Sequence, residues 1–189
     1  MTGSQRLDEW IRSGETRALA GHRIFVRTAA TPGLPALLLI HGYPTSSYDW
    51  HRVWTRLAAR YSLYACDMLG FGMSDKPRSS DYSIVLQADI CQALLDAFGI
   101  ASVHVLAHDY GDTVAQELLA REREGRLRLR SMCFLNGGLF PETHRARPVQ
   151  KLLATPVLGT LLARTMSYRK FESTMLSISG RQPPSREEL

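Results

Sequence analysis

Short apolar runs alternate with stretches of helical periodicity along most of the chain. The run Leu37–Ile40 is continuously apolar, as expected of a strand whose two faces are both covered by helices. Apolar residues at helical spacing follow several of the runs, and Gly99 supplies a stop signal after one of these helical segments. The expected strands are Arg23–Thr28, Ala36–Ile40, Ser62–Cys66, Val103–Ala107 and Ser131–Leu135, and the expected helices are His51–Arg60, Ser83–Phe98 and Thr113–Arg121. This alternation predicts an α/β protein with a mainly parallel sheet flanked by helices.

The alternation stops after Asn136-Gly137-Gly138, where a stretch of leucines, prolines and arginines begins. We therefore expect two parts: residues 1–140, the front part of an α/β core, and residues 141–189, the start of an inserted helical lid. Ser185, with Glu188 three residues later, is a fresh N-cap signal near the last residue. A helix that starts there predicts a truncated chain whose core is not completed.

Composition and charge exclude some classes of partner. The hydrophobic content of 44% is ordinary for a globular domain. Much of the formal net charge of +5 lies in residues 121–130, where arginine and glutamate alternate without interleaved aromatic residues. This pattern indicates a solvated helix end and loop, and it argues against nucleic-acid binding. The apolar stretch 152–166 is interrupted by Pro156, Gly159 and Arg164 and falls short of the roughly 20 residues that a membrane span needs.

The three cysteines are odd in number and lack Cys-x-x-Cys spacing. Cys66 and Cys133 fall in apolar strand-like runs, where a buried free thiol is the usual explanation. The N-terminal residues contain no apolar signal core. We therefore expect a reduced, cytoplasmic protein. Neither a metal nor a cofactor is expected, and the sequence leaves the oligomeric state open.

Polar motifs follow the ends of three consecutive expected strands. They are His41-Gly42-Tyr43-Pro44, the segment from Asp67 to Pro77, and His108-Asp109-Tyr110-Gly111. In open α/β sheets the ligand crevice lies at the carboxyl ends of the strands, so these segments can converge. Each motif alone is a weak indication, but all three in order make a strong joint one.

Asp109 lies between an apolar run that ends at Ala107 and a helical pattern that begins at Thr113. This strand–turn–helix layout is the setting of a nucleophile elbow, whose usual sequence is Gly-x-Ser-x-Gly. Here the frame is Ala107-x-Asp109-x-Gly111, so a carboxylate takes the serine position. A carboxylate is ionised near neutral pH and can attack an sp³ carbon to form an alkyl-enzyme ester. The alternative interpretation is a plain turn or N-cap aspartate.

These motifs together resemble the α/β-hydrolase superfamily, in the branch that holds epoxide hydrolases and haloalkane dehalogenases. The resemblance rests on residues 41–50 and 108–112 and on the run Asn136–Arg145. It extends from about Gly21 onward and covers only the front portion of a family member. It implies an α/β-hydrolase fold, truncated at the start of the helical lid. It also implies an ester at Asp109 that water then hydrolyses.

The resemblance further assigns roles to individual residues. The backbone N–H groups of Tyr43 and Tyr110 would stabilise the tetrahedral oxyanion. We interpret Asp112 as a first-turn partner of the helix dipole. Asp67 and Ser74 are interpreted as residues that order their own turn. The residues read as motif scaffold are His41, Gly42, Pro44, His108 and Gly111.

The late histidine and acid of the family are expected beyond the reach of this chain. His144 is the only histidine after the elbow, and it comes too early to match the late base. In some dehalogenases the acid follows the next strand, and the matching place here is held by Asn136. We therefore expect this chain to form the ester without turnover.

Three functions are compatible with the sequence. The aromatic residue Tyr43 favours an epoxide-hydrolase-like enzyme acting on a small apolar electrophile. The second possibility is a dehalogenase-like hydrolase, although Tyr43 and Tyr110 replace the halide-binding residues typical of that class. The third is a non-catalytic fragment or interaction module that retains the elbow.

Overall fold

The computed structural model describes residues 3–125 and 127–139, together with the isolated positions 155, 167, 169, 172, 173 and 176. It divides into two compact units, Glu9–Leu139 on one hand and Met1–Asp8 with Phe140–Leu189 on the other. All the strands described belong to the first unit. The predicted lid helix at Ser185, and His144, lie outside the described residues.

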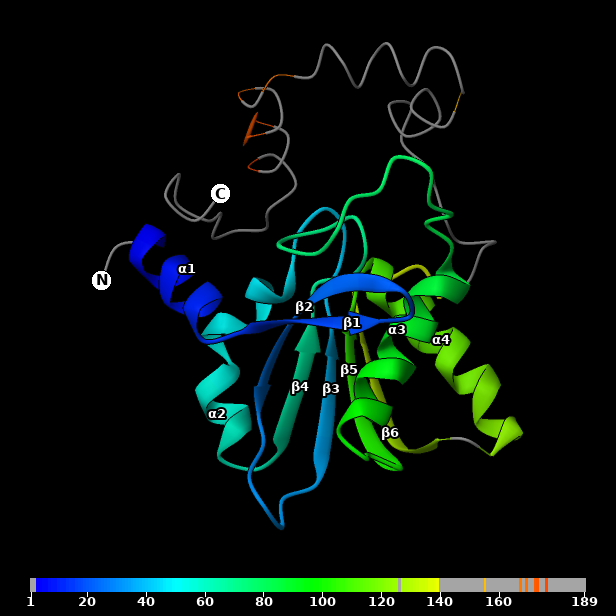
Figure 1. Ribbon diagram of the computed structural model, residues 1–189. Coiled ribbons are helices and arrows are strands. Elements are labelled where there is room, and N and C mark those ends of the chain that lie inside the picture. The colour runs from blue at the N-terminus through cyan, green and yellow to red at the C-terminus, as the bar shows by residue number, and fades with distance from the viewer. Residues whose placement is uncertain are drawn as a thin grey trace. The chain divides into compact units, whose positions relative to one another are not determined.

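A six-stranded sheet in the order β1-β2-β4-β3-β5-β6 forms the centre of the unit Glu9–Leu139 (Figure 1). Strand β3 pairs in parallel with β4 and β5, and β5 pairs in parallel with β6. Strand β2 pairs antiparallel with β1 and β4. The strands are β1 Glu15–Leu19, β2 His22–Ala29, β3 Ala36–Ile40, β4 Ser62–Cys66, β5 Ser102–His108 and β6 Arg128–Leu135. The predicted α/β class is confirmed and all five predicted strands are present; β1 was not predicted.

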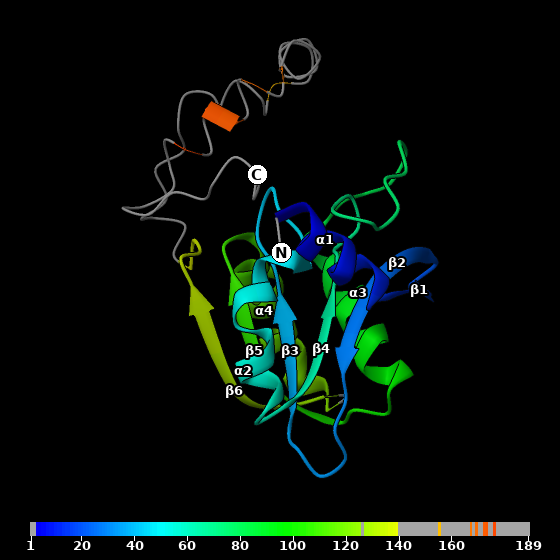
Figure 2. The same ribbon diagram turned by 90° about the vertical axis from the view of Figure 1, so that its left-hand side faces the viewer.

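Helices cover both faces of this sheet. Figure 1 shows α2 on one side and α3 and α4 on the other, and in Figure 2 α2 lies in front of β3. The helices are α1 Gly3–Arg12, α2 Trp54–Ala58, α3 Ile84–Ala97 and α4 Tyr110–Arg121, with 3₁₀ turns η1 Ser47–Arg52 and η2 Glu122–Glu124. The predicted helix His51–Arg60 was wrong in extent, because a 3₁₀ turn occupies its beginning and α2 its remainder. Ser83 caps α3, its hydroxyl accepting the N–H of Leu86.

The apolar run of β3 divides between two cores. Leu38 and Ile40 pack in the cluster that includes residues of α3 and α4, whereas Leu37 and Leu39 pack with Trp54 of α2. Successive side chains of a strand point to opposite faces, so an uninterrupted apolar strand needs cover on both sides. The structure confirms that expectation for β3.

Strand β6 differs from the sequence prediction in its surroundings. Cys133, expected to be buried, is exposed, because among the described strands β6 pairs with β5 alone. Residues Arg128–Arg130, expected in a loop, begin this strand. None of the helices in the described residues has the length and hydropathy to cross a bilayer. The same residues contain no group of three or more potential metal ligands.

Candidate active site

Asp109 occupies a strained turn between the last residue of β5 and the first residue of α4. Its backbone has φ 52° and ψ −115°, and positive φ is uncommon for residues other than glycine. Such a conformation costs about 1–3 kcal/mol and persists only where its surroundings hold it. Here the Asp109 N–H donates to the Leu135 carbonyl at 2.9 Å, and the Asp109 carbonyl accepts the Asp112 N–H at 3.0 Å.

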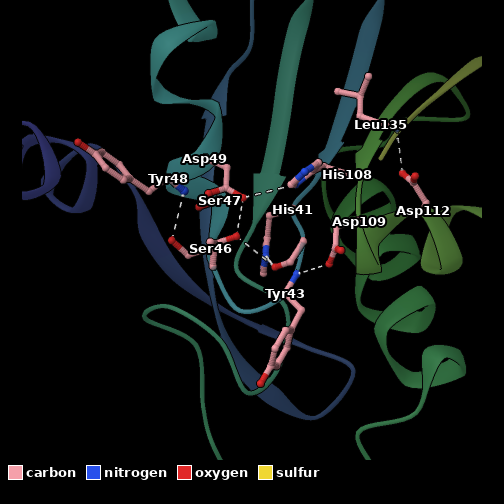
Figure 3. A network of polar contacts seen from close by, with 12 residues as sticks. His41, Tyr43, Ser46, Ser47, Tyr48, Asp49, His108, Asp109, Asp112 and Leu135 are labelled. Atoms are coloured by element: carbon pink, nitrogen blue, oxygen red, sulfur yellow. Dashed lines mark hydrogen bonds and ion pairs between the residues drawn. The ribbon is translucent and has the colours of Figure 1, made fainter. Parts of the chain in front are cut away.

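The Asp109 side chain does not cap the helix that follows it. Its Oδ1 instead accepts the backbone N–H of Tyr43 at 2.8 Å, from a residue 66 positions earlier in the chain (Figure 3). The carboxylate therefore faces the segment after β3. The sequence also allowed Asp109 to be a plain N-cap residue, and this geometry does not fit that role.

Two glycines allow the three backbone segments to approach. A Cβ on Gly111 would lie 2.5 Å from the His41 carbonyl oxygen and 2.7 Å from that of Ile40. A Cβ on Gly42 would lie 2.7 Å from the Cβ of Asp109. No side chain fits at either place, so the elbow and the segment after β3 meet only because both positions are glycine.

His41 orients the amide that contacts Asp109. Its ring is buried; Nε2 accepts the Met68 N–H at 2.9 Å, so Nδ1 carries the proton and donates to the Gly42 carbonyl at 2.8 Å. Burial lowers the pKa of His41, which favours this neutral form. The Gly42–Tyr43 peptide is planar, so anchoring its carbonyl directs the Tyr43 N–H to the opposite side. The Tyr43–Pro44 peptide bond is cis.

Asp67 joins the loops that follow β3 and β4. Its buried carboxylate accepts the N–H of Ser47 at 2.8 Å and the N–H of Met73 at 2.7 Å. Ser74 Oγ donates to the Asp67 carbonyl at 2.6 Å. The local contacts agree with the predicted turn-ordering role, but the bond to Ser47 links a second loop that the sequence did not indicate.

Asp112 lies in the first turn of α4, as predicted, but its side chain is buried. Oδ1 accepts the Leu135 N–H at 3.3 Å, and Oδ2 has no hydrogen-bond partner in the described residues. Desolvation raises the pKa of Asp112, while the backbone N–H groups of Leu135 and Gly137 act in the opposite direction. Asp112 thus contacts the backbone of Leu135, the last residue of β6. The next residue, Asn136, has a positive φ of 58°.

Sequence reasoning missed two residues near the elbow. The Phe71 ring centroid lies 5.4 Å from that of His41 and 6.1 Å from those of Tyr43 and Tyr110. Asp49 lies 3.9 Å from His108. The aromatic side chain of Phe71 within the motif Asp67–Pro77 was a usable signal, whereas no spacing pattern distinguishes Asp49.

Comparison with known proteins gives a family match. Residues 35–155 match the family described as alpha/beta hydrolase fold. The mesoderm-specific transcript homolog protein of Homo sapiens is 45% identical over 196 residues, which cover 98% of this chain and 58% of that protein. The putative hydrolase LipZ of Mycobacterium tuberculosis is 41% identical over 171 residues, covering 89% of this chain and 58% of its own length. The chain therefore spans well under two thirds of these relatives.

Solved structures share the same fold. A haloalkane dehalogenase from Bradyrhizobium elkani is 29% identical with a TM-score of 0.77, over 93% of this chain and 61% of its own. An epoxide hydrolase is 24% identical with a TM-score of 0.67, over 86% of this chain and 59% of its own. At that identity the second similarity concerns the fold alone.

Proposed function

Because this chain belongs to the α/β-hydrolase fold family, we propose that it carries the nucleophile half of a hydrolase that acts through an ester on Asp109. The observation that carries the proposal is the combination of a strained backbone at Asp109 and a carboxylate that bonds to Tyr43 instead of capping α4. Strain of this kind is found at functional sites where the surrounding structure enforces it.

In the first step the two carboxylate oxygens have different roles. Oδ1 is engaged by the Tyr43 N–H, which leaves Oδ2 to attack an electrophilic sp³ carbon of the substrate. A carbon–oxygen bond forms to Asp109, and the carbon–halogen or epoxide carbon–oxygen bond breaks, with its electron pair going to the leaving atom. A halide departs as such, whereas an opened epoxide oxygen takes a proton from a water molecule.

In the second step water adds to the ester carbonyl carbon, and negative charge develops on Oδ1. The Tyr43 N–H already lies 2.8 Å from that atom, so it stabilises this charge without rearrangement. Tyr110 supplies the second donor in our proposal, because its N–H belongs to the first residue of α4, where backbone N–H groups lack partners within the helix.

The proposed substrate is a small apolar epoxide. Tyr43, a residue that is 65% exposed, and Phe71 give this end of the sheet an aromatic character. A haloalkane is the second candidate, favoured by the dehalogenase that is 29% identical.

The free thiols of Cys66, Cys91 and Cys133 support the cytoplasmic location inferred from sequence.

We further propose that the 189 residues form the ester and do not turn over. Hydrolysis needs a general base. Among the described residues no histidine hydrogen-bonds to the Asp109 carboxylate, because both nitrogens of His41 are engaged elsewhere and His108 Nδ1 faces Asp49. His144 lies outside the described residues.

Reaction with a small reactive epoxide, and separately with an alkyl bromide, tests the proposal. In a Cys133→Ser chain, which lacks the exposed competing thiol, we expect intact-mass spectrometry to show one adduct per chain and no sustained release of product. The preferred electrophile distinguishes the two substrate classes. Absence of an adduct with both reagents, from a chain shown to be folded, would support the non-catalytic interaction module.

A further inference from the structure

Asp49 lies beside the oxyanion-hole segment and takes no part in the steps above. It belongs to η1, and its Oδ2 lies 3.9 Å from Nδ1 of His108, the residue before the nucleophile (Figure 3). The same Oδ2 accepts a hydrogen bond from Thr45 Oγ1. The side chains of Asp49 and His108 are 26% and 37% exposed, so their attraction is less screened than that of a fully exposed pair.

Thr45 connects Asp49 to the peptide that holds the oxyanion donor. Its hydroxyl lies between Asp49 Oδ2 and the Gly42 carbonyl oxygen, 3.2 Å away. A hydroxyl has one proton, so it donates to one of these acceptors at a time. Ionised Asp49 takes that hydrogen bond. Neutral Asp49 can donate its own O–H to Thr45, whose proton then turns to Gly42.

The Gly42 carbonyl and the Tyr43 N–H are the two ends of one peptide group. A hydrogen bond accepted by the carbonyl polarises the peptide and strengthens the N–H as a donor. Ionised Asp49, which takes the Thr45 proton, therefore leaves the Tyr43 N–H a weaker donor, and neutral Asp49 makes it a stronger one. At the same time the 3.9 Å contact between Asp49 Oδ2 and His108 Nδ1 ties the segment after β3 to the end of β5.

Of the ionisable groups that face His108, Asp49 is the one that pairs with it in the described residues. His41 faces the pair from the segment after β3, and Asp112 faces His108 from α4. Burial lowers the pKa of His41, and burial raises the pKa values of Asp49 and Asp112. In the described residues, His108 and Asp49 are the two of these groups that form an ion-pair contact within 4.0 Å.

We propose that Asp49 is a positioning residue for the oxyanion hole, joining the Gly42–Tyr43 peptide, through Thr45, to His108 at the end of the nucleophile strand. The proposal rests on the proposed role of Asp109. Loss of the Asp49 carboxylate then removes the contact with His108 that ties the segment after β3 to the end of β5. The Asp109 carboxylate is held less well in position, and ester formation slows by about threefold or more.

Carboxyl-carbon NMR of the full chain tests the contacts without any chemistry at Asp109. His108→Gln and Thr45→Val each remove a group that favours ionised Asp49. We expect each variant to raise the titration midpoint of Asp49 by about half a unit or more. His51→Gln is the control, since that ring lies in the same 3₁₀ turn and stacks on Tyr48. An Asp49 midpoint unchanged in both variants overturns the proposal.

The amide proton resonance of Tyr43 tests the link to the oxyanion donor. We expect Asp49→Asn and Thr45→Val to shift it, and Asp96→Asn, on the surface of α3, to leave it in place. A Tyr43 resonance that stays in place in both variants overturns the proposal, and if one variant fails to fold the other decides. Neither NMR measurement needs an adduct, so both test this proposal separately from the role of Asp109 as nucleophile. If the expected NMR changes are seen but no adduct forms, the result counts against Asp109 alone.

Discussion

The backbone N–H of Tyr43 donates to Asp109 Oδ1 over 2.8 Å, although the two residues are 66 positions apart in sequence. In the proposed mechanism, negative charge develops on Oδ1 when water attacks an ester at Asp109, and this bond would place a backbone donor at that atom. His41, through the Gly42 carbonyl, holds the donor peptide in place. The elbow and the segment after β3 therefore form one assembly, and its parts can be disturbed separately.

Gly111→Ala should destabilise the protein by about 1–3 kcal/mol, because an added Cβ meets two backbone carbonyl oxygens that cannot rotate away. Urea denaturation measures the change in the free energy of unfolding. Leu119→Ala, at a 44% exposed position of the same helix, is the control and should change it by less than about 0.5 kcal/mol. Equal stability of Gly111→Ala and the wild type would show that α4 does not approach β3 as closely as described.

Asp67→Asn should cost about 1–3 kcal/mol, because the Ser47 N–H and the Met73 N–H bond to different carboxylate oxygens and asparagine keeps only one of them. One of these buried donors would face the NH₂ group of the asparagine. Thermal and urea denaturation measure the loss. The control Asp96→Asn makes the same chemical change on an exposed helix surface. An equal loss of stability in this control would contradict the proposed role of the Asp67 carboxylate in joining the two loops.

Asp112→Asn should change how stability depends on pH. Desolvation raises the pKa of Asp112 in the folded protein above its ordinary value of 3.8, so unfolding releases a proton between the two values. The free energy of unfolding contributed by this group therefore falls as pH rises through that window, and asparagine removes this fall.

We expect the stability of Asp112→Asn relative to the wild type to increase from pH ~3.5 to pH ~6, in urea titrations at several pH values. The neutral exchange Thr113→Ala on the same helix should show no such increase. A relative stability of Asp112→Asn that is independent of pH would contradict the buried environment of this carboxyl.

Local sequence patterns predicted much of the fold but not its N-terminal part. The continuously apolar β3 was predictable because burial on both faces leaves a mark in sequence. Strand β1 was not, because it has mostly exposed residues. Helix α1 depends on Trp10, whose ring packs 4.9 Å from Trp54 and stacks against Arg27. These contacts join distant parts of the chain, so no local window reveals them.

The same distinction holds at the site. Asp109 could be proposed from sequence because strand, turn and helix are contiguous around it. The contacts of Asp67 with Ser47, and of Asp49 with His108, depend on how separate loops fold together. The side chain of Asp109 also had two possible roles in sequence, and only its direction in space favours attack over capping.

The central claim is that Asp109 forms the covalent ester, and tandem mass spectrometry of the epoxide-treated chain tests it most directly. Cys133→Ser is the starting protein, because the exposed Cys133 thiol is a competing site of alkylation. We expect the adduct on the peptide that contains Asp109, released by hydroxylamine as an ester is, and absent after Asp109→Asn. An adduct on another residue, or one that persists in folded Asp109→Asn, would contradict the account.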